Sequence, residues 1–394
     1  MALRKERTLA GHACVAFVGL GLPDGLLGVA WPSMRSTFGV PLDALGALFA
    51  SFTAGFVLSS FAGGRSVRAL GLGGLLAASC AATGLSLLGY ALSGSWPLVV
   101  GLGFVAGLGA GGIDTGINTY AAMRHGPRFL NLLHACWGVG ATLGPALMTA
   151  VLATGRSWPL GYALVAGAQL ALAVVFAATQ GAWPSAGASA HEASQEPFAG
   201  TLRLRGARVG ILLFAAYTGL ELGIGAWAFT VLTEGRGRPP AVAGGWTSLY
   251  WLSLTGGRLA AAAIVPQLGA PLLLRSAMVL LAAGVSLFAA GIAPSLDLLG
   301  LLIAGAAAGP IFPTLIAQTP VRLGAGHAPN AVGFQIAAAS LGAALWPAAL
   351  GVLGARMGLE ALALGLVALA LVVLALNEWA IQSVDEKARP HLPA

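Results

Sequence analysis

Three carboxyl side chains lie well inside long apolar stretches of the chain, away from their ends, namely Asp24, Asp114 and Glu221. A charged side chain at the centre of a membrane helix costs roughly 2.5–3.5 kcal/mol on insertion scales, so each acid requires a physical reason. Burial disfavours the charged form of a carboxyl group, which allows it to bind and release a proton near neutral pH. We therefore predict proton coupling by these acids. The alternative for each is a structural ion pair or hydrogen bond.

The densest polar grouping surrounds Asp114. Asn118 follows four positions later and shares its helix face. The next apolar stretch opens with Asn131 and His134, which also share a face, and only a short loop separates the two stretches. We predict a site in which Asp114 and His134 relay a proton while Asn118 and Asn131 bind the substrate. A purely structural histidine is the alternative for His134.

Arg258 is the one basic residue placed inside an apolar stretch. It is a candidate partner for an acid or for an anionic substrate, although a snorkelling side chain would have the same position. Gln335 is a further candidate ligand for a sugar. Candidates for stacking against a sugar ring, with helix packing or an interfacial belt as the alternative, are Trp31, Trp137, Trp227, Tyr250, Trp251 and Trp346.

Motifs for other functions are missing from the sequence. We find no phosphate-binding loop, no dinucleotide-binding turn, no Ser/His/Asp arrangement and no metal-ligand cluster, so we expect neither an enzyme nor a bound cofactor or metal. Cys14, Cys80 and Cys136 lie in apolar stretches without metal-binding spacing. The basic residues that give the net charge of +7 are scattered over short loops, which argues against a nucleic-acid partner.

The elements that must position these residues are membrane helices. The 394 residues are 57% hydrophobic and 8% charged, whereas soluble domains carry about 25% charged residues. Stretches of roughly 20 apolar residues, enough to cross ~30 Å of hydrocarbon, recur along the chain. We predict an all-α integral membrane protein with twelve transmembrane helices over residues 9–31, 42–62, 71–92, 97–122, 130–153, 158–180, 208–232, 242–264, 271–293, 296–318, 328–354 and 358–380.

A polar segment over residues 181–207 interrupts this pattern and is rich in Ser, Pro, Gly, Glu and Arg. It predicts a linker between two six-helix bundles, the first over residues 1–180 and the second, with a short tail, over residues 208–394.

Basic residues predict the orientation in the membrane. With the N-terminus inside, fourteen fall on the inner side: Arg4, Lys5, Arg7, Arg65, Arg68, Arg124, Arg128, Arg203, Arg205, Arg208, Arg275, Arg322, Lys387 and Arg389. Five fall on the outer side: Arg35, Arg156, Arg236, Arg238 and Arg356. The positive-inside rule places both termini and the linker in the cytoplasm. We expect the inner (plasma) membrane of a bacterium, because the excess of Arg over Lys, eighteen to two, suggests a GC-rich genome.

The two halves repeat each other. The stretch from Gly140 to Ala146 recurs 202 positions later from Gly342 to Ala348. In the same way Ala106-Gly107 with Gly111 recurs 198 positions later as Ala304-Gly305 with Gly309. These small residues suit close packing of helices. Parallel six-helix repeats describe the major facilitator architecture.

One branch of that superfamily shares local motifs with the chain. The runs Gly107–Asn118, Leu130–His134 and Gly138–Ala141 resemble the fourth and fifth helices of the fucose permeases. The resemblance implies proton-coupled sugar uptake, or sodium coupling as in some animal relatives. The family has a functional acid in span one, which Asp24 matches. It also has an acid followed by Asn in span four, which Asp114 and Asn118 match. The resemblance therefore implies functional roles for these three residues.

Other residues support or depart from this resemblance. The Leu-Asn motif that opens span five is matched by Leu130-Asn131, and Tyr217-x-Gly219-x-Glu221 with Trp227 and Gly257-Arg258 also looks like this branch. The fucose permeases carry Glu where this chain has Asp114, and Gln where it has His134. The run Gly63–Arg68 lacks the Asp of the general superfamily signature.

The leading functional prediction is a secondary active transporter, acting as a monomer in lipid, that moves a neutral, hexose-like sugar by alternating access with proton symport. A proton-coupled exporter of drugs or other amphiphilic molecules is the first alternative. A membrane sensor or scaffold that does not transport is the second, and it would require an additional soluble domain.

Overall fold

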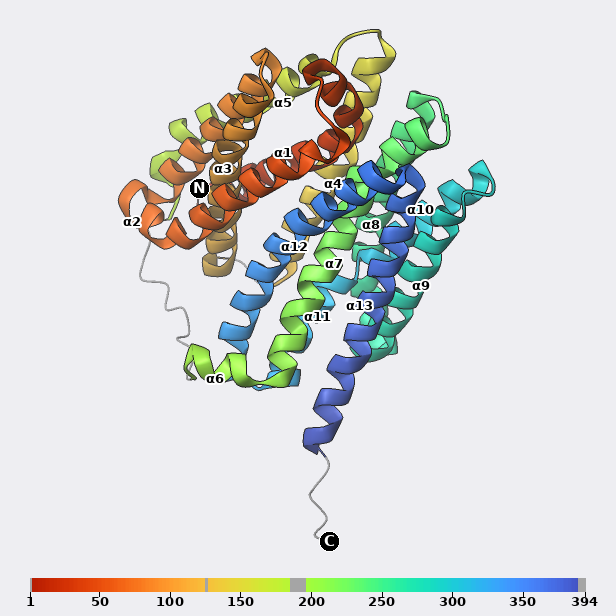
Figure 1. The fold of residues 1–394 in the computed structure, drawn as a ribbon. Coiled ribbons are helices and arrows are strands. Elements are labelled where there is room, and N and C mark those ends of the chain that lie inside the picture. The colour runs from red at the N-terminus through yellow and green to blue at the C-terminus, as the bar shows by residue number, and fades with distance from the viewer. Residues whose placement is uncertain (1, 125–126, 185–195, 389–394) are drawn as a thin grey trace. The chain divides into compact units, whose positions relative to one another are not determined.

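A computed structural model describes residues 2–124, 127–184 and 196–388 of the chain. Within these ranges, the side chains of residues 2–5, 122–124, 127, 128, 130, 131, 262 and 382–388 lie outside the description. The secondary structure of the described residues is helical without any strand (Figure 1). This confirms the predicted all-α fold class, because a backbone in hydrocarbon must satisfy its hydrogen bonds within each spanning segment.

The first half of the chain, up to the predicted linker, contains five long helices and two short 3-10 segments. Their bounds are α1 Ala2–Phe38, η1 Leu42–Ala44, α2 Leu45–Leu92, α3 Trp96–Arg124, α4 Pro127–Ala153, α5 Trp158–Ala178 and η2 Gln180–Ala182. The remainder contains α6 Phe198–Arg203, α7 Arg205–Thr230, the π-helical η3 Val231–Gly235, α8 Pro240–Leu268, α9 Ala270–Ala290, α10 Pro294–Ala308, α11 Ile311–Leu323, α12 Ala328–Met357 and α13 Leu359–Ala388.

Ten helical segments of the described residues are long and apolar enough to cross a membrane. One of them, Leu42–Leu92, contains Gly71 with a φ of 69°, where two helices meet, and therefore supplies two spans. The 29-residue helix α8 is not among the ten and completes a set of twelve. The predicted twelve-helix architecture is thus confirmed.

Two predicted boundaries differ from the structure. Residues 63–70 were expected to connect two spans, but they continue α2 as helix, and the chain turns only at Gly71. The predicted single span 296–318 is interrupted, because α10 ends at Ala308 and α11 begins at Ile311. Proline explains the second difference: Pro310 and Pro313 lack the backbone N–H that a continuous helix requires.

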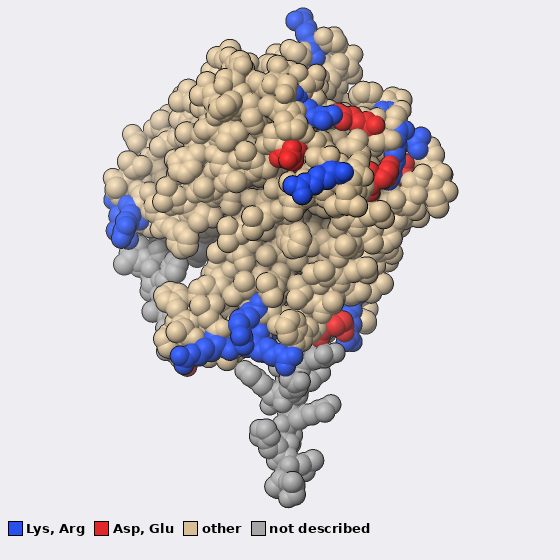
Figure 2. Space-filling model, viewed as in Figure 1, with Lys and Arg blue, Asp and Glu red and all other residues tan. Residues whose placement is uncertain are grey.

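The exposed surface carries many large apolar side chains, more than is usual for a protein surrounded by water. Large side chains such as Phe61, Leu92 and Ile292 are 80%, 77% and 77% exposed. The face drawn in Figure 2 shows broad uncharged areas between groups of charged side chains. Apolar patches of this kind mark a surface covered by another apolar phase, which fits a protein that crosses the membrane many times.

Contacts divide the chain into two compact units. The first unit contains Met1–Ser189, Gly225–Leu252 and Gly354–Leu359, and the second contains Ala190–Ile224, Ser253–Leu353 and Glu360–Ala394. The later part of α7 and the earlier part of α8 therefore pack with the first five helices. The predicted division into domains at the linker, of which residues 185–195 lie outside the described residues, stays a prediction.

Glycines on facing helices set the packing of the first unit. A side chain on Gly21 or Gly25 of α1 would overlap the backbone carbonyls of Trp137 and Ala141 on α4. In the same unit, Gly111 of α3 lies against the carbonyl of Phe56 on α2. Small residues let membrane helices approach to backbone contact, as the sequence predicts.

The second unit repeats this packing. Gly309 lies against the carbonyl of Leu254 on α8, and both residues follow their counterparts Gly111 and Phe56 by 198 positions. Likewise Gly342 of α12 lies against the carbonyl of Ala215 on α7. The internal repeat seen in the sequence is therefore also a repeat of helix contacts.

Candidate functional site

Asp24 lies half-buried on α1, and its carboxyl group has a partner on α4. The indole Nε1 of Trp137 donates a hydrogen bond to its Oδ2 atom over 3.1 Å. The glycines that bring α1 and α4 together make this contact feasible, because Gly21 lies directly against the backbone of Trp137. A neutral donor thus binds an acidic group within the apolar zone.

Two further aromatic side chains extend from this pair. The rings of Trp137 and Trp251 meet edge to face with their centroids 5.7 Å apart, and Tyr250 contacts Trp251 at 5.1 Å. Trp251 and Tyr250 are fully buried on α8 within the first unit. We call Asp24, Trp137, Tyr250 and Trp251 the Asp24 cluster. It combines a carboxyl group with aromatic surfaces, which suits a ligand that has both polar and apolar faces.

Asp114 has a local partner on α3. The Nδ2 atom of Asn118 donates to its Oδ1 atom over 3.0 Å, and both side chains are half-buried. His134 on α4 lies edge-on to the ring of Phe17 on α1, with centroids 6.0 Å apart. The side chain of Asn131 lies outside the described residues. The structure therefore brings together Asp114 and Asn118, and the predicted relay to His134 stays a prediction.

Glu221 in the second unit has a different environment. It is buried on α7, where the Tyr217 hydroxyl lies 2.5 Å from its Oε2 atom. The guanidinium of Arg258 on α8 lies 3.6 Å from its Oε1 atom. Arg258 also donates from Nε to the carbonyl of Gly309 over 3.3 Å. Of the predicted roles for Arg258, the structure supports that of a partner for an acid.

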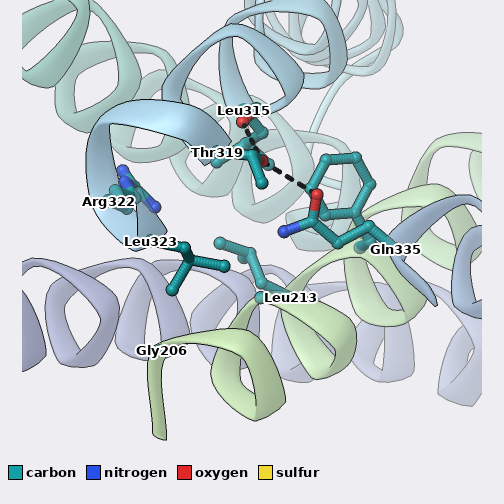
Figure 3. A pocket seen from close by; sticks show the side chains of 9 residues that line it. Gly206, Leu213, Leu315, Thr319, Arg322, Leu323 and Gln335 are labelled. Atoms are coloured by element: carbon teal, nitrogen blue, oxygen red, sulfur yellow. Dashed lines mark hydrogen bonds between the residues drawn. The ribbon is translucent and has the colours of Figure 1, made fainter. Parts of the chain in front are cut away.

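Gln335 lies at a small cavity of the second unit (Figure 3). Its Oε1 atom accepts a hydrogen bond from Thr319 over 2.9 Å, and Arg322 also lines the cavity. The cavity volume is about 10 Å³, which is near the space that one water molecule needs. In this conformation Gln335 thus meets a space of water size, and its predicted role as a sugar ligand stays a prediction.

The remaining aromatic candidates have different surroundings. Trp227 is fully buried within the first unit. Trp346 on α12 is 37% exposed and packs against Gly219 of α7 in the second unit. Trp31 is fully buried against Trp96, with centroids 5.3 Å apart. Packing accounts for the positions of Trp31 and Trp346, whereas Trp137 and Trp251 contact the acid or its neighbours.

An open groove of about 460 Å³ lies at the C-terminal end of α1. Polar groups of Ser33, Ser36 and Arg156 line it together with Trp158, whose indole donates to Thr37 over 2.9 Å. The groove is roomy enough for a small solute. The groove is widely open to its surroundings, so it does not enclose a ligand as a closed binding site would.

Sequence reasoning missed one charged pair of the first unit. The guanidinium of Arg35, at the end of α1, lies 2.5 Å from the carboxyl group of Glu234 in η3, and the two side chains are 30% and 29% exposed. The two residues are 199 positions apart, so no local spacing identifies them. The signal available was that both fall at predicted outer ends of the first spans of the two halves.

The side chains in the described part of the chain form no group of three or more His, Cys, Asp or Glu that could hold a metal ion. Asp24, Asp114 and Glu221 are instead paired with indole, amide, phenol and guanidinium groups.

Solved structures share the fold over nearly the whole chain. A mutant of the nucleoside transporter NupG has a TM-score of 0.78 at 13% identity, covering 94% of this chain and 98% of its own. A D-xylose-proton symporter has a TM-score of 0.74 at 16% identity, covering 93% and 96%. The E. coli fucose:proton symporter FucP has a TM-score of 0.61 at 15% identity, covering 95% and 98%.

Identities this low show the fold alone, and no curated protein matches the chain. The family comparison goes further. The family model described as Major Facilitator Superfamily matches residues 13–347, which is most of the chain. The twelve helices and the repeated glycine contacts agree with that match. The chain therefore belongs to the major facilitator superfamily and is a membrane transporter rather than an enzyme.

Proposed function

We propose that this transporter moves a neutral, hexose-like sugar by alternating access, coupled to protons in symport. The observation that carries the proposal is the Asp24 cluster, in which a carboxyl group bonded to an indole N–H adjoins the rings of Trp251 and Tyr250. The names of two relatives of the same fold, a D-xylose-proton symporter and a fucose:proton symporter, support the same substrate class.

A sugar requires both kinds of surface that the Asp24 cluster offers. Its ring has an apolar face that stacks on aromatic side chains, and its hydroxyl groups need hydrogen-bond partners, because an unpaired buried polar group costs about 1–3 kcal/mol. The carboxyl group of Asp24 can accept from a hydroxyl while the indoles supply the apolar surface. Asn118 would supply an amide beside Asp114.

The partners of the two acids in the first unit support proton coupling. Trp137 and Asn118 are neutral donors, so protonation of Asp24 or Asp114 would strand no buried cation. We assign the main proton carrier to Asp114, with Asp24 as the second candidate.

One feature of the Asp24 cluster also supports the alternative function. A carboxyl group next to a series of three contacting aromatic rings could equally accept a lipophilic cation. Export of an amphiphilic molecule coupled to protons therefore remains the second candidate.

A binding experiment separates the two candidates. A ligand that binds the folded state raises the melting temperature by mass action. The purified protein is therefore heated with a panel of neutral hexoses and pentoses and, separately, with lipophilic cations. Stabilisation by a sugar, lost in Trp137→Ala and kept in Trp346→Ala, supports the proposal. Stabilisation by the cations alone would support the exporter.

A further inference from the structure

Glu221 in the second unit is connected to a break between two helices. The charged and titratable groups at its carboxyl include Tyr217, one turn earlier on α7, and Arg258 from α8. Each of these also reaches a backbone carbonyl near the α10–α11 break. The Tyr217 hydroxyl lies 2.7 Å from the carbonyl oxygen of Ala308, and Arg258 donates to that of Gly309.

The break exists because proline removes backbone donors. In a continuous helix the carbonyl of Gly309 would accept from the N–H of residue 313, but Pro313 has none. Arg258 supplies the missing donor from a neighbouring helix. The approach of α8 is close, since a side chain on Gly309 would overlap the carbonyl of Leu254.

Counting protons shows what the carboxyl group can control. The Tyr217 hydroxyl carries one proton but has at least two oxygen atoms within hydrogen-bonding distance, Glu221 Oε2 and the Ala308 carbonyl. When Glu221 is ionised, the hydroxyl should donate to the carboxylate, because a charge-assisted hydrogen bond is roughly twice as strong as a neutral one. The Ala308 carbonyl then loses this donor.

When Glu221 takes up a proton, both contacts can be made at once. The carboxylic O–H donates to the Tyr217 oxygen, and the Tyr217 O–H donates to the Ala308 carbonyl. One proton from solution is bound, the hydrogen bonds rearrange, and no other covalent bond is formed or broken. Arg258 keeps its contact with Gly309 while its attraction to the carboxyl weakens.

We propose that Glu221 is a proton-binding site of the second half and that Tyr217 transmits its protonation state to the junction between α10 and α11. Binding of the proton tightens the junction, and its release loosens it. Tyr217 is thus a positioning residue that acts through the Ala308 carbonyl. The inference requires neither the sugar substrate nor the assignment of Asp114 as proton carrier.

Hydrogen exchange of the purified full-length protein tests this directly. Peptides that cover residues 304–316 are followed by mass spectrometry from pH 5 to pH 9, after correction for the intrinsic pH dependence of exchange. We expect roughly three- to tenfold faster exchange at the junction in the ionised state, the range that one net hydrogen bond gives. Peptides from α2 should show no such change.

Two variants should fix the junction in opposite states. Glu221→Gln keeps a donor toward Tyr217, so the junction should stay protected at every pH. Tyr217→Phe removes the donor to Ala308, so exchange should stay fast at every pH. Asp114→Asn serves as the matched control and should keep the wild-type pH dependence, which separates this test from that of the sugar symport proposal.

Exchange in the wild type that is independent of pH would overturn the proposal, and so would pH dependence that persists in Glu221→Gln. Infrared difference spectra between low and high pH give a second measurement that does not depend on the junction. In an Asp24→Asn/Asp114→Asn background, the band of a protonated carboxylic acid should appear, and Glu221→Gln should remove it. Absence of that band in the background protein would also refute proton binding at Glu221.

Discussion

At the scale of single residues, the three candidate acids of this transporter differ in the side chains that bind them. Asp24 and Asp114 are bound by neutral donors, whereas Glu221 has a phenol and a guanidinium. The cost of charging or neutralising a buried group depends on its partners. Three acids in one protein can therefore perform different tasks, and substitutions at each should have different effects.

Asp114→Asn mimics a permanently protonated acid at the proposed proton carrier. Exchange of substrate across the membrane requires no net proton movement and should persist, as should substrate binding. Accumulation driven by a pH gradient should fall to the level of protein-free vesicles. Both are measured with the protein in proteoliposomes. Accumulation by Asp114→Asn against a gradient would show that another group, with Asp24 tested next, carries the proton.

Trp137→Phe removes the hydrogen bond to Asp24 and keeps an aromatic ring. The free energy of unfolding, measured by titration with denaturing detergent, should fall by about 1 kcal/mol, the typical net contribution of one hydrogen bond. Trp31→Phe is the matched control, because the indole nitrogen of Trp31 is buried without a hydrogen-bond partner among the described residues. An equal loss of stability in both variants would mean that ring size, rather than the hydrogen bond, decides the effect.

At the scale of elements, glycine contacts determine how closely the helices pack. Gly107 of α3 lies against the carbonyl of Phe52 on α2, whereas Gly101 on the same helix faces open space. This difference permits a test in which helix propensity changes equally at both positions.

Gly107→Val should destabilise the protein by roughly 1–3 kcal/mol, the range for overpacked sites. Gly101→Val should be neutral or slightly stabilising, because a side chain there meets nothing within 4 Å. The same detergent titration measures both. Equal effects at the two positions would show that backbone flexibility dominates over the α2–α3 contact.

The helices themselves were predictable from the sequence, but their breaks were not. Apolar runs of about 20 residues predict a spanning helix whatever its backbone hydrogen bonds do. Pro310 and Pro313 fall inside such a run, so hydropathy predicts one span, and the structure has one membrane-crossing segment there, Pro294–Leu323, divided into α10 and α11. The connection between the second and third spans was predicted over residues 63–70, because these include Arg65 and Arg68, but they stay helical and the chain turns at Gly71.

The candidate site was predictable only in part. Asp114 and Asn118 share a helix face, and the structure joins them as local spacing predicts. Asp24 and Trp137 were both candidates, yet their bond links residues 113 positions apart. Pairings of this range depend on which helices pack together, and a single sequence does not specify that.

At the scale of the whole molecule, the basic residues predict the orientation. Both termini and the linker should lie in the cytoplasm. Single cysteines at Ser95, in the exposed loop between α2 and α3, and at Leu202, exposed on α6, should react oppositely with a membrane-impermeant thiol reagent in intact cells. Cys14, Cys80 and Cys136 are first replaced by alanine. Labelling of Leu202→Cys from outside would reverse the assigned topology.

The membership of residues 225–252 in the first unit has a consequence for building hybrid transporters. A fusion made at the linker would take Gly28 and Thr149 from one parent, and their contacts Gly225 and Gly244 from the other. If the parent that supplies residues 225 and 244 has a larger residue at either position, its side chain would overlap atoms of residue 28 or residue 149 from the other parent. Crossovers within α7 and α8 that transfer residues 225–252 with the N-terminal parent keep these partners together. Shuffled libraries should therefore yield more folded hybrids at those crossovers than at the linker.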